Sequence, residues 1–190
     1  MRDLYLLLTP LLVLGVIGLV RFVGCELIYN VDELPQPLIT DQVFGTPRND
    51  YSGFAGMAID VGSKPLVVRF LGRYCVAGST GDHHVQIIDS VTGTVVPGAE
   101  VVVSLAAKPE GFETKKLDPD VTLGAGRRYY VVSEEFDGGD RFFDNDTAVI
   151  AKPVASIVSP VFFDASISQW RLLGLTGHSY GPVQLYYVPD

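Results

Sequence analysis

The chain has little of the chemistry with which small extracellular domains cross-link themselves or bind transition metals. It contains two cysteines, three histidines and one tryptophan in 190 residues. Two cysteines exclude a disulfide framework, which requires several pairs. No cluster of cysteine and histidine exists, which argues against a zinc site. His83 and His84 are adjacent, and in a strand they would point to opposite faces.

Basic residues are also scarce, since 14 Lys and Arg face 22 Asp and Glu, for a net charge of −8. Such a surface repels phosphate, which argues against nucleic acid and anionic lipid headgroups as partners. The sequence contains no phosphate-binding loop and no convincing nucleophile–base pair. We therefore expect a protein that is not an enzyme and needs no cofactor, with calcium as the one ion to consider.

One pattern typical of a catalytic site occurs in the amino-acid sequence. Gly177-His178-Ser179-Tyr180-Gly181 matches the G-x-S-x-G nucleophile elbow. The elbow requires a following helix, and an acid and a histidine later in the chain. Pro182 follows at once and nine residues remain after Gly181, so a turn between two strands is the better interpretation.

A long hydrophobic run occurs once, at residues 4–20, where 17 residues carry no charge. Three interpretations fit it. A transmembrane helix needs about 17–25 residues, and the run just attains this length when Phe22 and Val23 extend it. A lipoprotein signal would acylate Cys25, which follows Gly24, and a secretory signal would be cleaved. All three predict that the domain lies on the periplasmic or extracellular side, anchored by a single pass or by lipid in the first two.

The region after the run divides into two parts. Pro35, Pro37 and Pro47, with several acidic residues, predict that residues 26–50 form an extended tether. Residues 51–190 are then the folded domain, preceded by the anchor or signal at residues 1–25. One domain of this size is long enough to bury a core.

From residue 51 the apolar pattern has a period of two, which is typical of half-buried strands. Leu66, Val68, Phe70, Gly72, Tyr74 and Val76 alternate with Arg69 and Arg73, which predicts a strand with both arginines on the outer face. Cys75 in this strand is expected to be a small buried or half-buried thiol. No window after residue 25 has a period of 3.6. The sequence predicts an all-β fold, an antiparallel β-sandwich or jelly roll, preceded by one N-terminal transmembrane or signal helix.

Strand candidates in this part of the chain are separated by Gly or Pro at most gaps. They are residues 66–76, 85–88, 94–96, 100–105, 111–117, 127–133, 147–150, 154–158, 161–165, 169–173 and 183–188.

Acidic residues crowd around Gly138-Gly139. Calcium prefers several carboxylate and carbonyl oxygens from one loop. The alternative is a solvated loop in which aspartates cap turns. Both remain open, and the calcium candidates are Glu135, Asp137, Asp140, Asp144 and Asp146.

Aromatic residues are plentiful, with nine Tyr and ten Phe, and several stand in adjacent pairs. In a strand, one member of each pair would point inward and the other outward. Exposed aromatics serve protein interfaces or sugar stacking, and the single Trp favours protein contacts. The candidates for interaction are Tyr129, Phe142, Trp170, Tyr180 and Tyr186.

Several short stretches appear together in a recognisable order: Leu71-Gly72-Arg73, Gly81-Asp82-His83-His84-Val85, Thr92-Gly93, Leu123–Ser133, Gly138–Asp144 and Gly177–Val183. With these, residues 51–188 resemble a β-sandwich accessory module of large bacterial surface and secreted multimodular proteins. The resemblance implies a non-catalytic module, with glycan binding as the usual expectation. The chain departs from it as a single module on an anchor, and has Phe142 where Trp is common.

Two functions follow. The first is a structural subunit that docks on a larger membrane-protein complex, with the lipid bilayer and other membrane subunits as partners of its N-terminal helix and sandwich. The second is a module that binds cell-surface carbohydrate, with or without the assistance of calcium.

Overall fold

The computed structural model describes residues 34–181 and 183–189. All regular structure in this part of the chain is β, as the alternating pattern predicts. The predicted anchor or signal at residues 1–25, including Cys25, lies outside the described residues. Within the described ranges, the structure has no helix of sufficient length and hydrophobicity to cross a membrane.

The strands pair antiparallel throughout the described registers. Their bounds are β1 (Gln36–Pro37), β2 (Ile39–Val43), β3 (Pro47–Arg48), β4 (Gly53–Val61), β5 (Leu66–Cys75), β6 (Asp82–Asp89), β7 (Val95–Ser104), β8 (Gly111–Leu123), β9 (Arg128–Glu135), β10 (Phe142–Phe143), β11 (Thr147–Ala151), β12 (Ala155–Asp164), β13 (Gln169–Leu172), β14 (His178–Ser179) and β15 (Val183–Val188).

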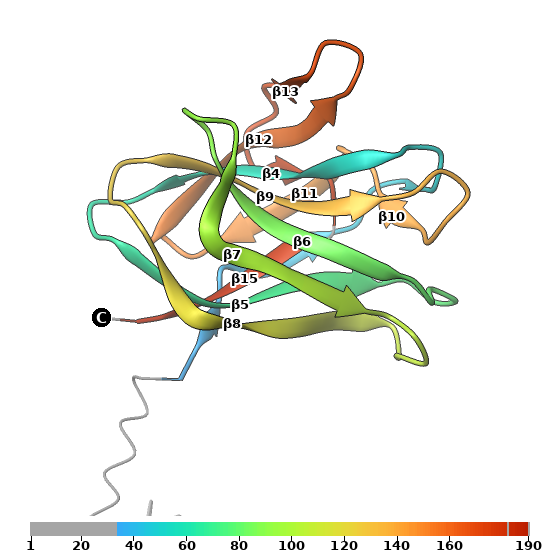
Figure 1. Cartoon of the computed structure of the whole chain (residues 1–190), viewed down its shortest axis with the longest axis horizontal. Helices are drawn as coiled ribbons and strands as arrows, with labels where there is room; N and C mark the ends of the chain where they lie inside the picture. Colours follow the sequence, from blue (N-terminus) through green and yellow to red (C-terminus); the bar gives the residue numbers. More distant parts are fainter. Residues whose placement is uncertain (1–33, 182, 190) are drawn as a thin grey trace, which may run out of the picture. The chain divides into compact units, whose positions relative to one another are not determined.

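Two sheets form the layers of a sandwich-like arrangement (Figure 1). One has six strands in the order β13-β12-β4-β9-β6-β7, and the other has four in the order β1-β15-β5-β8. Alternate apolar side chains from both sheets meet in one core, for example Met57 and Val131 from the first and Leu71 and Leu185 from the second. Burial of these facing rows is the main source of stability for such a fold.

Two small sheets, β14-β11-β2 and β10-β3, complete the domain and draw residues 36–48 into it. The backbone there is extended, as the prolines predict, but it pairs with the domain instead of running free as a tether. Leu38 and Ile39 are buried at 0% and 6% exposure. The buried Gln184 amide holds Ile39, accepting from its N–H and donating to its carbonyl oxygen at 2.9 Å each.

A β-bulge in β5 changes which side chains face the core. The register shifts between Val68 and Phe70, so Leu66 and Val68 point inward before it and Leu71, Arg73 and Cys75 after it. The prediction that Arg73 lies on the outer face is therefore wrong, because one extra residue reverses the faces of the rest of a strand.

Candidate docking surface

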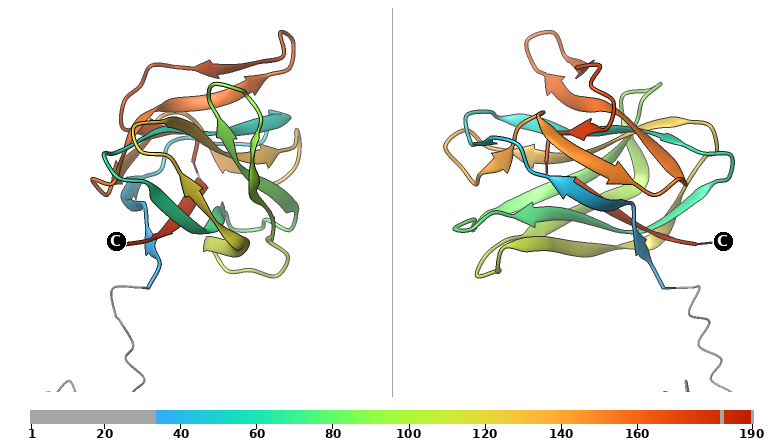
Figure 2. Two further views of the ribbon diagram at one scale, coloured as in Figure 1. Left: turned by 60° about the vertical axis from the view of Figure 1, so that its left-hand side comes forward. Right: turned by 180° about the vertical axis from the view of Figure 1, so that it is seen from behind.

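The β12–β13 hairpin presents aliphatic side chains to solvent at one edge of the six-stranded sheet. Figures 1 and 2 show it projecting on the side of the domain opposite β1 and the end of β15. Ile167, Leu172, Leu173 and Leu175 are 38–46% exposed. We call these four residues the hairpin surface. Exposed apolar side chains gathered in one segment mark an interaction site more often than scattered ones do.

Hydrogen bonds hold this hairpin in place. The Ser159 hydroxyl, 1% exposed, accepts from the N–H groups of Leu173 and Gly174 at 2.9 and 2.8 Å and donates to the Pro160 carbonyl. Trp170 Nε1 donates to the Gly93 carbonyl at 3.3 Å, and its ring packs between Tyr130 and Phe163. The leucines are thus displayed by an anchored strand.

The other predicted interaction aromatics are more buried than expected. Tyr129, Phe142 and Tyr180 are 3%, 1% and 9% exposed, and Tyr186 is half-buried beside Phe70. The expectation of one outward member per pair is wrong for Tyr129–Tyr130 and for Phe142–Phe143, whose members are all buried. For the tyrosines the reason is a second apolar cluster that covers the other face of β9.

Two of these aromatics line a cavity of about 180 Å³, which we call the aromatic pocket. Its lining residues are Arg48, Tyr51, Ala55, Phe142, Phe162 and Tyr180. The Arg48 guanidinium lies 5.7 Å from the Phe142 ring centre, and its charge is paired with Asp50 and Asp144 at 2.7 and 3.0 Å.

The two tyrosine hydroxyls of the aromatic pocket differ. Tyr51 Oη donates to the Phe163 carbonyl at 2.8 Å, and burial, followed by repulsion from the neighbouring Tyr180, raises the pKa of Tyr51 to about 12. Tyr180 Oη has one hydrogen bond among the described residues, a long one of 3.5 Å accepted from Asn145 Nδ2. The Tyr180 proton is therefore available to a ligand.

The predicted calcium ligands are dispersed over different protein donors. Glu135 pairs with Arg73, Asp144 with Arg48, and Asp146 accepts from the N–H and hydroxyl of Thr46. Asp140 accepts from the N–H groups of Thr80 and Gly81, while the Asp137 N–H donates to the Ser52 hydroxyl. In the described ranges, no three His, Cys, Asp or Glu side chains are grouped to hold a metal ion. Asp140 and Asp146 act as the turn-capping alternative predicts, and calcium binding stays a prediction.

Glu135 belongs instead to a buried ionic group that joins the two sheets. Arg73 on β5 and Glu135 on β9 are 0% and 2% exposed, and form two hydrogen bonds of 2.6 and 3.1 Å. Beside them the buried His83 contacts the Glu134 carbonyl through Nδ1 at 2.6 Å and Asp140 Oδ2 through Nε2 at 3.1 Å. We call Arg73, Glu135, His83 and Asp140 the inter-sheet clamp.

Three residues of the inter-sheet clamp lie in sequence stretches on which the predicted resemblance to bacterial surface modules rests. They are Arg73, His83 and Asp140, one from each of three such stretches. A charged side chain is buried at low cost only when it is paired and hydrogen-bonded. Polar residues within otherwise apolar strands are thus the feature of the sequence that could have indicated this buried ionic group.

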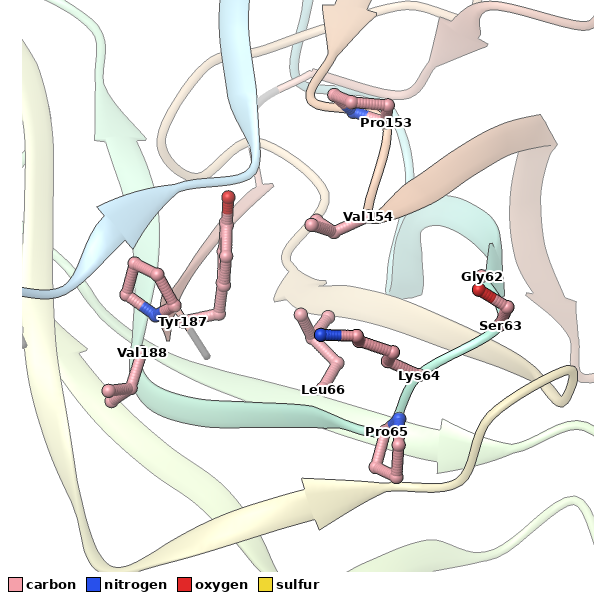
Figure 3. A pocket seen from close by; sticks show the side chains of 10 residues that line it. Gly62, Ser63, Lys64, Pro65, Leu66, Pro153, Val154, Tyr187 and Val188 are labelled. Atoms are coloured by element: carbon pink, nitrogen blue, oxygen red, sulfur yellow. The ribbon is translucent and has the colours of Figure 1, made fainter. Parts of the chain in front are cut away.

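A larger open cavity, of about 340 Å³, lies among the β4–β5 turn, the β11–β12 turn and the end of β15. Figure 3 shows Lys64 extending over Leu66 toward the middle of this cavity, with Val154 and Tyr187 on its far side. The described residues that line it include no carboxylate, histidine or cysteine.

The residues of the G-x-S-x-G pattern do not form an elbow. Ser179 lies in the two-residue strand β14, is 2% exposed, and donates its hydroxyl to the Tyr180 carbonyl at 2.7 Å. His178 Nδ1 contacts the Thr176 carbonyl instead of Ser179. The next described element is strand β15, where the elbow needs a helix.

Cys75 is a buried free thiol, 1% exposed, which confirms the sequence prediction. Burial raises its pKa, so the reactive thiolate is disfavoured.

Comparison with known protein families and with curated proteins finds no match. The resemblance to bacterial surface modules therefore stays a prediction.

Proposed function

We propose that the chain is a non-catalytic, membrane-anchored subunit whose β-sandwich lies on the extracytoplasmic side and docks on a larger membrane-protein complex. The observation that carries this proposal is the hairpin surface, four exposed aliphatic side chains on an anchored segment at a sheet edge. The hydrophobic run at residues 4–20 supports the membrane anchor.

The composition of the hairpin fits the centre of a protein interface. Between Ala165 and Thr176 the only charged residue is Arg171. Interface centres are depleted in charge and enriched in arginine and aromatic side chains. Complete burial of one leucine or isoleucine contributes about 1.5–3 kcal/mol, so completing the burial of four half-exposed ones is a substantial driving force.

The test is the size of the full chain after extraction from its native membranes in mild detergent. We expect the wild-type chain to elute in a large complex of fixed composition, and the double variant Leu172→Glu/Leu175→Glu to elute free. Val43→Glu is the matched control, since Val43 is 71% exposed on β2. Elution of the wild-type chain as a small free species contradicts the proposal.

The anchor is tested separately by deleting residues 1–24. If docking depends on the anchor, the shortened chain loses its place in the complex although its hairpin is intact. A shortened chain that performs every cellular role contradicts the anchored arrangement.

A second candidate function is binding of cell-surface carbohydrate, and the aromatic pocket is the observation that favours it. Its rings offer apolar faces, and Arg48 and the Tyr180 hydroxyl offer hydrogen-bond donors. A glycan array probed with and without calcium tests it, with Tyr180→Phe as the variant that removes only a hydroxyl. The absence of any hit under both conditions rejects this candidate.

A further inference from the structure

Strand β13 has a backbone edge that no strand of the described domain covers. It lies at the end of the order β13-β12-β4-β9-β6-β7 and pairs only with β12. Its length is four residues, Gln169–Leu172. An uncovered edge strand is a template for pairing with another extended segment, and many proteins recognise peptides in this way.

The phase of the β12–β13 hydrogen bonds identifies which groups are free. The Leu173 N–H donates to the Pro160 carbonyl at 3.2 Å, so the backbone N–H and C=O groups of Leu173 point toward β12. Because the N–H and C=O groups alternate in direction along a strand, the backbone groups of Arg171 and Gln169 point toward β12 as well. Trp170 and Leu172 therefore direct their N–H and C=O groups away from the sheet.

The side chains along this edge have a definite chemical order. Trp170 and Leu172 share one face of β13, and Arg171 lies between them on the other face. The Arg171 side chain is exposed. After the hydrogen bond from Ser166, its positive charge helps to lower the pKa of Asp164 on β12, and it is directed toward solvent where an added strand would lie. Directly opposite residues of an added strand would meet these side chains, and opposite charges there are stabilising.

We infer that the docking partner contributes an extended segment that pairs with β13 and carries an acidic residue opposite Arg171, flanked by apolar residues opposite Trp170 and Leu172. This inference rests on the proposed docking function and names its mode. Pairing of two copies of this chain is disfavoured in the register that sets Trp170 against Leu172, because Arg171 would face its own copy.

Position 172 allows the backbone and side-chain contributions to be separated. Leu172→Pro removes the outward N–H but none of the bonds to β12, and Leu172→Ala shortens the side chain but retains the N–H. In the full chain extracted from native membranes, we expect Leu172→Pro to lower the fraction in the complex by about tenfold, as the loss of one interfacial hydrogen bond implies. Leu172→Ala should lower it less.

Arg171 provides the second pair of variants. Arg171→Glu should weaken the complex several-fold more than Arg171→Gln, because it sets like charges opposite each other. Melting temperatures of all four variants establish that the domain stays folded. If Leu172→Pro unfolds the domain, the test of strand addition rests on whether Arg171→Glu weakens the complex more than Arg171→Gln does.

The outcomes separate the mode of docking from docking itself. Strand addition is supported if Leu172→Pro lowers the fraction of chain in the complex more than Leu172→Ala does, and if Arg171→Glu lowers it more than Arg171→Gln does. If Leu172→Pro behaves like Leu172→Ala, or the two Arg171 variants are equal, strand addition is overturned. If docking through the hairpin is correct but strand addition is not, Leu172→Glu/Leu175→Glu still dissociates the complex. If none of the hairpin variants changes the fraction of chain in the complex, both docking through the hairpin and strand addition are overturned.

Discussion

The inter-sheet clamp and the hairpin surface invert the usual distribution of side chains in opposite ways. The inter-sheet clamp places an arginine, a glutamate and a histidine at 0–2% exposure, where each is hydrogen-bonded. The hairpin surface places four aliphatic side chains in solvent at 38–46% exposure. Buried charges that are fully paired serve the fold, whereas exposed apolar groups without cover are available to a partner.

The comparison separates two signals that look alike in a sequence. Acidic residues near Gly138-Gly139 suggest a ligand site, yet Glu135 and Asp140 are committed to contacts within the domain. The leucines near Gly174 look like core residues, yet they are exposed. Residue type alone therefore does not distinguish a ligand site from a structural contact in this domain.

The largest expected effect is at the inter-sheet clamp. Glu135→Ala leaves the Arg73 charge buried without its partner and should lower the free energy of unfolding by about 3–5 kcal/mol, measured by urea denaturation. The double variant Arg73→Met/Glu135→Leu should lose much less, because neither charge then remains. A loss below about 1 kcal/mol for Glu135→Ala would show that the pair is not buried as described.

Ser159→Ala should have an intermediate effect that is confined to the hairpin. It removes the acceptor of the Gly174 N–H and one of the two acceptors of the Leu173 N–H, at a cost of about 1–3 kcal/mol. Hydrogen exchange should accelerate at these two amides and stay unchanged in β9. Equal acceleration throughout the domain would contradict the separate anchoring of the hairpin.

Asp140 should make the inter-sheet clamp sensitive to acid. Burial acts to raise its pKa, but hydrogen bonds from Thr80, Gly81 and His83 outweigh this and lower it below its usual value. A lowered pKa in the folded state stabilises the fold above the unfolded value, and this stability is lost as the pH falls through the folded value. Asp140→Asn should cost about 1 kcal/mol at pH 7 and flatten the acid side of a stability–pH profile. An unchanged profile would contradict the contacts of Asp140.

The smallest expected effect on stability is at the hairpin surface. Leu172→Gln and Leu175→Gln should each change the free energy of unfolding by less than about 0.5 kcal/mol, measured by urea denaturation beside Glu135→Ala. The same substitutions should lower binding of a hydrophobic dye to the free chain. A loss of several kcal/mol would mean that these leucines belong to the core.

Much of the fold follows from the sequence because alternation is a local signal. The antiparallel strands, the buried Cys75 and the opposite faces of His83 and His84 could all be predicted. The β-bulges in β5 and β12 could not, because an extra residue leaves no local mark and reverses the faces beyond it. This is why Arg73 was expected at the surface.

The candidate site was less accessible to sequence reasoning. Trp170 could be identified as notable, but its packing against Tyr130 and Phe163 depends on strand order. The exposure of Leu172 and Leu175 follows from the position of β13 at a sheet edge, which pairing between distant segments decides.

The most direct test of the account is hydrogen exchange at the Trp170 and Leu172 amides in two states of the full chain. The wild-type chain in the complex extracted from native membranes is compared with the Leu175→Glu variant, whose substitution lies outside β13 and which we expect to dissociate from the complex. The account predicts that both amides exchange rapidly in the free chain and are protected in the complex, while Arg171 is protected in both. Equal exchange at Trp170 and Leu172 in the two states would contradict docking through β13.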